Sequence, residues 1–218
     1  MTTAQRPTGV FISLEGGDGS GKSTQLKLLA DSLKAIGHDV VTTREPGGSD
    51  SAEEIRKLIL EGDADRWSPL TEALLMYASR RDHLERTILP SLARGAIVIS
   101  DRFADSTMAF QGIAGAVGED TIHKLHALVV GEHNPNLTLI FDLPIEEGLR
   151  RSGDTGVEQR FESKGAAFQE QARRAFLKIA ESEPHRCAVV DARGDVADVA
   201  IRVMDKVQKR LPALFKNC

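Results

Sequence analysis

The chain has 218 residues, 41% of them hydrophobic and 28% charged, with a formal net charge of −4. This length suits one domain with a substantial core, the negative charge argues against a general nucleic-acid-binding surface, and no apolar stretch is long enough to span a membrane. The two cysteines, Cys187 and Cys218, lie far apart, which favours a reducing compartment; we expect a cytoplasmic protein in which residues 1–8 form a flexible N-terminus.

A glycine-rich loop follows the first expected strand. Apolar residues 10–14 indicate a buried strand, and residues 22–36 have the apolar spacing of an amphipathic helix. Between them, residues 16–23 match the G-x-x-x-x-G-K-[ST] pattern completely. Backbone N–H groups of such a loop face the phosphates of a nucleoside triphosphate, with Lys22 reaching the β- and γ-phosphates and the Ser23 hydroxyl placed to bind Mg²⁺. The alternative, a glycine turn with a stray lysine, is disfavoured by the flanking strand and helix.

The rest of the chain alternates between short apolar strands and helices. Further strands are expected at residues 40–43, 97–100, 137–142 and 188–191, and helices at 51–60, 68–92, 120–130 and after Asp195. The alternation indicates βαβ units. It predicts an α/β fold with a five-stranded parallel sheet flanked by helices, in a single domain over residues 1–218.

Charged residues come directly after the strand at 97–100. In open α/β sheets ligands bind beyond the carboxyl ends of the strands. Asp101 is therefore placed to hold a metal ion with its water shell, and Arg102 to clamp a phosphate with two hydrogen bonds. A surface ion pair would be the preferred interpretation if the glycine loop were absent.

Met76 and Arg80 lie four residues apart, so they share one face of their expected helix. An apolar platform beside a planar donor group suits a flat base with carbonyl edges. Core packing for Met76 and a surface position for Arg80 are an alternative that periodicity supports equally.

A polar segment at residues 150–156 interrupts the pattern. It contains Arg150, Arg151 and two glycines, and Arg160 lies just beyond it. A solvated surface loop is one interpretation. In a phosphoryl-transfer enzyme a mobile basic loop would close over the transferring phosphate and add positive charge, so we expect a short lid at about residues 150–162.

Six strings narrow the functional interpretation further: EGGDGSGKST at 15–24, TREPGG at 43–48, EIR at 54–56, YASR at 77–80, DRF at 101–103 and STMAFQG at 106–112. With them the chain resembles the bacterial thymidylate kinases, P-loop nucleoside monophosphate kinases, along nearly all its length. The resemblance implies the reaction ATP + dTMP → ADP + dTDP with Mg²⁺, as a step in dTTP synthesis. It also implies a cytoplasmic homodimer, and the net charge of −4 gives no reason to expect nucleic-acid binding.

The resemblance also implies roles for individual residues. ATP would be bound by the loop residues Gly16, Gly17, Asp18, Gly19, Ser20, Gly21, Lys22, Ser23 and Thr24, and Mg²⁺ by Ser23 and Asp101. The dTMP pocket would be bordered by Asp18, Glu45, Arg56, Met76, Arg80, Arg102, Thr107, Phe110 and Gln111. Catalysis would depend on Lys22, on Arg102, which holds the acceptor phosphate, and on Arg151 or Arg160 from the lid.

Three other interpretations remain open at this point. The chain could be another nucleoside monophosphate or deoxynucleoside kinase, a GTP-driven switch protein, or a non-catalytic nucleotide-binding module. A switch protein reads guanine through an N-K-x-D element, which this sequence lacks. Intact Lys22, Asp101 and Arg102 argue against the non-catalytic module.

Overall fold

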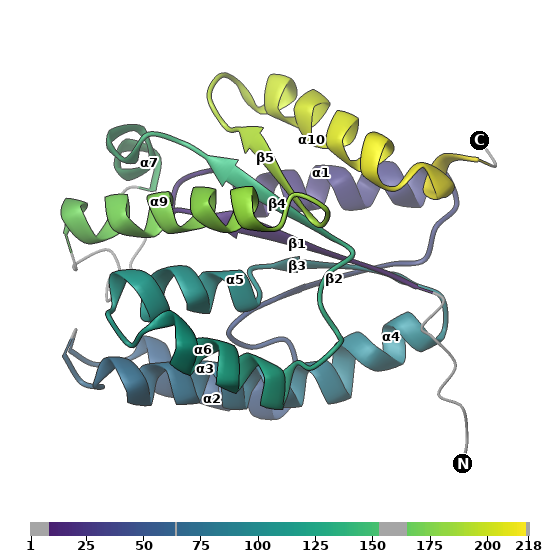
Figure 1. The fold of residues 1–218 in the computed structure, drawn as a ribbon. Coiled ribbons are helices and arrows are strands. Elements are labelled where there is room, and N and C mark those ends of the chain that lie inside the picture. Colours follow the sequence, from purple (N-terminus) through teal and green to yellow (C-terminus); the bar gives the residue numbers. More distant parts are fainter. Residues whose placement is uncertain (1–8, 64, 153–164, 217–218) are drawn as a thin grey trace, which may run out of the picture.

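The structure is a computed structural model that describes residues 9–63, 65–152 and 165–216 (Figure 1). Within these residues five strands form one sheet in which every neighbouring pair is parallel. In spatial order they are β2 (Val40–Arg44), β3 (Ile97–Asp101), β1 (Val10–Gly16), β4 (Leu137–Asp142) and β5 (Cys187–Asp191). The predicted α/β fold with a five-stranded parallel sheet is confirmed.

Helices cover both faces of the sheet (Figure 1). Helices α1 (Lys22–Ala35) and α10 (Val196–Arg210) pack on one face. The other face carries α3 (Pro69–His83), α5 (Ala104–Thr107), α6 (Glu119–Val129) and α9 (Ala166–Ser182). Helix α2 (Asp50–Leu60) packs on α3. Two shorter helices are α4 (Leu89–Ala93) and α7 (Ile145–Ser152). None of the helices in the described ranges has the length and apolar character needed to cross a bilayer.

The alternation of side chains along β1 divides the core into two clusters. Ile12 and Leu14 belong to the cluster beneath α1 and α10, whereas Phe11 belongs to the cluster beneath α3, α5 and α9. Successive strand residues point to opposite faces, so Ser13 and Glu15 share the Phe11 side, and both are fully buried. A carboxylate is thereby placed in the core beneath α5.

The sequence pattern located the strands within two residues but missed several helices. The helix expected over 68–92 is interrupted by a π-helical turn at Leu84–Ile88, and Met108–Ala114 is also π-helical. Helices α5, α7 and α9 were not predicted. The interpretation of residues 150–156 as a loop is wrong at its start, because α7 continues to Ser152. The rest of the expected lid, including Arg160, and residues 1–8 lie outside the described residues.

Candidate active site

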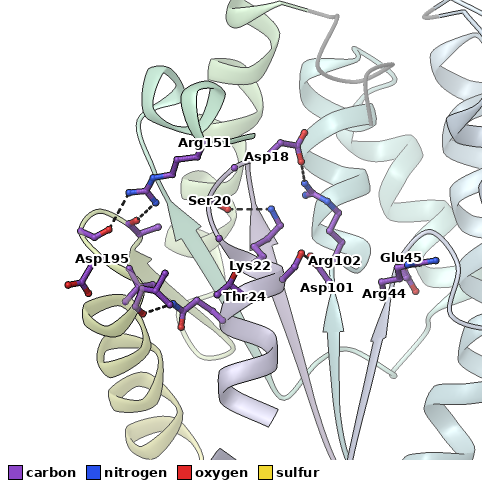
Figure 2. Close-up of a pocket in the computed structure, with 18 of the residues that line it drawn as sticks. Asp18, Ser20, Lys22, Thr24, Arg44, Glu45, Asp101, Arg102, Arg151 and Asp195 are labelled. Atoms are coloured by element: carbon purple, nitrogen blue, oxygen red, sulfur yellow. Dashed lines mark hydrogen bonds and ion pairs between the residues drawn. The ribbon is translucent and has the colours of Figure 1, made fainter. Parts of the chain in front are cut away.

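A cleft of about 930 Å³ opens at the carboxyl ends of the strands (Figure 2). It is lined by the loop after β1, the ends of β2 and β3, and the segment that joins β5 to α10. A smaller pocket adjoins it, and Asp18, Glu45 and Arg102 line both. The arrangement is that of two binding sites that meet at shared charged residues.

The glycine loop is shaped to hold an anion. Gly16, Gly19 and Gly21 have φ angles of 132°, 70° and 87°, a region that side chains with a Cβ rarely adopt. Lys22, at the start of α1, donates from Nζ to the Gly17 carbonyl oxygen at 2.7 Å and to Ser20 Oγ at 3.3 Å. Helix α1 then directs its N-terminal N–H groups into the cleft, which favours bound phosphate.

Residues 18–24 of the loop, Thr24 included, line the larger cleft. Gly16 and Gly17 contribute differently, because their carbonyl oxygens accept hydrogen bonds from Arg102 and Lys22. These two glycines therefore hold the cations of the site in place.

Two oxygen ligands meet at the edge of the loop. Ser23 Oγ donates a hydrogen bond to Asp101 Oδ2 at 2.6 Å, across 78 residues of sequence. Asp101 ends β3, which pairs with β1 so that Leu14 and Asp101 lie opposite each other. A hydroxyl and a carboxylate beside a phosphate site are the hard oxygen donors that Mg²⁺ prefers.

Arg102 connects the two pockets. Its φ angle is 70°, which is unusual for a residue with a side chain and turns the guanidinium back toward the glycine loop. It donates to the Gly16 carbonyl oxygen at 2.8 Å and to Ser106 Oγ at 3.1 Å, and it pairs with Asp18 at 2.5 Å (Figure 2). The simple surface ion pair between Asp101 and Arg102 is not formed, since the two side chains have different partners.

Arg80 lies at the wall of the smaller pocket and is only 2% exposed. Its Nε donates to Glu45 Oε2 at 2.7 Å, and its Nη2 donates to the Phe103 carbonyl oxygen at 3.1 Å and to Thr107 Oγ1 at 3.0 Å. Its Nη1 is buried without a hydrogen-bond partner among the described residues. Because an unpaired buried donor is costly, this nitrogen marks a place where a ligand oxygen belongs.

The other walls of the smaller pocket combine apolar side chains with a few polar ones. Its lining includes Pro46, Leu60, Met76, Phe103, Thr107, Phe110 and Gln111. Met76 therefore faces the pocket beside Arg80, which resolves the alternative that it belongs to the core. The Phe110 ring lies 5.2 Å from the Arg102 guanidinium and packs edge-on against Phe176.

Sequence reasoning missed three buried residues that hold these side chains. His83 Nδ1 donates to Glu45 Oε1 at 3.0 Å, and His83 Nε2 shares a hydrogen bond with Thr43 Oγ1 at 2.7 Å. Glu45 is thereby fixed between His83 and Arg80. The second residue is Glu72, which accepts a hydrogen bond from Gln111. The third is Glu15.

Glu15 anchors the turn that carries Arg102. Its carboxylate accepts from the Phe103 backbone N–H at 2.7 Å and from Ser106 Oγ at 2.5 Å. The pKa of Glu15 is raised to about 7, chiefly by burial and also by the nearby charge of Asp105, which together outweigh the lowering effect of the Ser106 hydrogen bond. Its position inside the EGGDGSGKST string was the only sign in the sequence.

Two further candidate arginines, Arg151 and Arg56, lie on the rim of the larger cleft. Arg151, on α7, points toward the cleft (Figure 2) and donates to the carbonyl oxygens of Ala192 and Gly194 at 3.1 and 3.3 Å. It also pairs with Glu147. Arg56, on α2, donates from Nη1 to the Pro46 carbonyl oxygen at 2.8 Å. Both side chains line the cleft.

A phosphate loop whose anion site opens into a second, base-sized pocket defines a kinase of the P-loop class that acts on a nucleotide. A family model for thymidylate kinase matches residues 14–203. The chain belongs to the thymidylate kinase family. It is therefore a kinase that phosphorylates dTMP to dTDP, with ATP as the phosphate donor, and the alternative of a different nucleotide kinase is not favoured.

Individual relatives agree over nearly the whole chain. It is 57% identical over 203 residues to the thymidylate kinase of Caulobacter vibrioides, covering 93% of this chain and 98% of the relative. It is 53% identical over 205 residues to that of Ruegeria pomeroyi, covering 94% and 97%. The crystal structure of thymidylate kinase from Ehrlichia chaffeensis superposes with a TM-score of 0.75 at 37% identity, covering 92% of this chain and 98% of that one.

Proposed function

We propose that this chain holds ATP in the larger cleft and dTMP in the smaller pocket. The γ-phosphoryl group is transferred where the two pockets meet, at Arg102 and Asp18, which line both of them. The observation that carries the proposal is this junction, at which a phosphate-binding loop and a base-sized pocket share the same arginine. A common guanidinium brings two nucleotide phosphates to one point, although they repel each other.

On the donor side, the loop N–H groups and Lys22 bind the phosphates of ATP. Ser23 and Asp101 hold Mg²⁺, which neutralises charge on the phosphates when bound. The cleft continues from the loop to Val196 and Val199 of α10, and we place the adenosine moiety there.

On the acceptor side, Arg102 exchanges its Asp18 partner for the phosphate of dTMP. The unpaired Nη1 of Arg80 donates to a carbonyl oxygen of thymine, and Met76 and Phe110 pack near the base. Thr107 and Gln111 supply further polar groups at the same wall. Glu45 and Arg56 border this pocket by fixing Arg80 and the Pro46 turn.

The reaction requires no general base, because the nucleophile is a phosphate oxygen that is already anionic at neutral pH. The protein positions the two nucleotides in line and neutralises their charge. Lys22 and Arg102 do so from the described residues, and Arg151 or Arg160 supplies the remaining positive charge at the transferring group. Comparing kcat of the Arg151→Ala and Arg160→Ala variants distinguishes these two arginines.

We further propose a cytoplasmic homodimer. Leu70 and Leu74 on α3 are 47% and 48% exposed, and Leu128 on the neighbouring α6 is 79% exposed. Exposed leucines on two adjacent helices are typical of a protein interface. A Leu74→Asp/Leu128→Asp variant should sediment as a monomer where the unmodified protein sediments as a dimer; equal sedimentation would contradict this interface.

The proposed site is tested by a coupled assay of ADP release, with and without dTMP, on the unmodified protein and on the variant Arg102→Ala. We expect turnover to fall by a factor of about 10³ or more, with ATP affinity nearly unchanged, if Arg102 acts on the acceptor and transition state. Arg174→Ala is the matched control, because the Arg174 side chain is 78% exposed and pairs with the surface residue Glu170. Loss of ATP affinity in Arg102→Ala would instead assign this arginine to the donor.

A further inference from the structure

A carboxylate and an amide side chain are buried together behind the smaller pocket. Glu72, in the first turn of α3, is 1% exposed, and Gln111, in the π-helical segment 108–114, is 2% exposed. Gln111 Nε2 donates to Glu72 Oε1 at 2.9 Å. Gln111 lines the smaller pocket, whereas Glu72 does not.

This pairing fixes the orientation of the Gln111 amide. A carboxylate only accepts hydrogen bonds, so the NH₂ end of the amide must face Glu72. The other end, the carbonyl oxygen Oε1, is then the group that Gln111 can present to a ligand. Reversing the amide would bring two acceptor oxygens together in a buried place, which is unfavourable.

Arg80 and Gln111 therefore give the pocket wall a donor and an acceptor, in addition to the Thr107 hydroxyl. The donor is Nη1 of Arg80, and the acceptor is Oε1 of Gln111. A pyrimidine with a carbonyl at C4 and an N–H at N3 satisfies both. A pyrimidine with an amino group at C4 and a bare N3 presents the reverse pattern and leaves buried groups unpaired.

We propose that Glu72 is a positioning residue that makes this enzyme select a 4-keto over a 4-amino pyrimidine nucleotide by holding the Gln111 amide in one orientation. The proposal rests on the proposed function, since it requires that the base of the acceptor occupies the smaller pocket. Glu72 itself does not touch the base.

The test compares dTMP with 5-methyl-dCMP, which differ only at the edge in question. In the isosteric variant Glu72→Gln the amide at position 72 can accept or donate, so the Gln111 amide can turn over. We expect the ratio of kcat/KM for dTMP over 5-methyl-dCMP to fall at least tenfold, mainly through KM, with ATP affinity unchanged. Glu85→Gln, at a half-exposed glutamate just beyond the same helix, should leave the ratio unaltered.

An exchange variant separates positioning from a general structural role. In Glu72→Gln/Gln111→Glu the amide and the carboxylate trade places, and a carboxylate oxygen again faces the pocket. We expect this variant to restore the preference for dTMP that Glu72→Gln loses.

Three outcomes overturn the proposal. The first is an unchanged ratio of kcat/KM for dTMP over 5-methyl-dCMP in Glu72→Gln, and the second is an exchange variant that behaves like the single variant. The third is a Glu72→Gln variant that loses ATP binding and thermal stability as well as its preference for dTMP. Failure of the proposed function looks different, because the unmodified enzyme would then not phosphorylate dTMP at all.

Discussion

Replacing Glu15 with glutamine should make the stability of this protein less dependent on pH. Glu15 is fully buried beneath α5, and its pKa is raised from 4.5 to about 7, chiefly by desolvation. Between these two values the folded protein keeps a proton that the unfolded chain releases. The stability from this group is thus fully present below about pH 4.5 and is lost as the pH rises through about 7.

The size of the effect follows from the two pKa values. A shift of one unit corresponds to about 1.4 kcal/mol, so the loss between pH 5 and pH 8 is about 2.5 kcal/mol. Glutamine is neutral at both pH values. It can still accept from the Phe103 N–H, and its own NH₂ can donate to Ser106 Oγ, so the two hydrogen bonds survive in Glu15→Gln.

Urea unfolding of both proteins at pH 5 and pH 8 measures the effect. The stability of Glu15→Gln relative to the unmodified protein should increase by about 2.5 kcal/mol between the two pH values. Carboxylates with lowered pKa values, such as Glu183 and Asp191, act in both proteins and cancel. Glu181→Gln, at an exposed glutamate, controls for loss of charge alone. If the two proteins lose stability in parallel, Glu15 is not a carboxyl whose ionisation opposes folding.

Three further outcomes follow from the geometry. Asp105→Ala should destabilise the protein by about 3–5 kcal/mol in urea unfolding. The Arg186 guanidinium, which Asp105 binds at 2.7 and 2.8 Å, would lose its buried counter-charge and keep the more exposed Glu183; a loss under about 1 kcal/mol would count against this. Gly19→Ala should weaken ATP binding at least tenfold by calorimetry, since its Cβ would lie 2.0 Å from the Gly148 carbonyl oxygen of α7 and its φ angle is 70°; unchanged affinity would mean that the loop tolerates displacement there. Cys187 should resist alkylation at pH 8 until the protein unfolds, because burial raises the pKa of its thiol to about 12, and rapid labelling of the folded protein at this residue would contradict that.

The strands and the phosphate loop were predictable because their signals are local. Strands β1, β3 and β4 are buried on both faces, so each appears in the sequence as a short apolar run. Helix α9 was missed for the opposite reason. Its buried side chains include Gln169, Ala172 and Ala175, which are polar or small and give a weak apolar pattern even though Phe176 and Ile179 complete the stripe. Tertiary packing, not local hydrophobicity, places this helix.

The motifs named the residues of the proposed site but could not name their hydrogen-bond partners. The motifs brought Arg80, Arg102 and Gln111 into one proposed pocket. Their fixed orientations come from pairs separated by 35, 84 and 39 residues, with Glu45, Asp18 and Glu72. A single sequence contains no signal that joins such distant residues. Whether Met76 faced the core or the pocket was undecided for the same reason.

The ion pair between Arg102 and Asp18 also bears on which anions can inhibit the enzyme. The arginine already has an anionic partner inside the chain, so every incoming phosphate competes with a tethered carboxylate at very high effective concentration. A whole nucleotide offsets this competition with contacts along its sugar and base. Inorganic phosphate and sulfate have no such contacts, and so the abundant small anions of the cell should be poor competitors for the acceptor position.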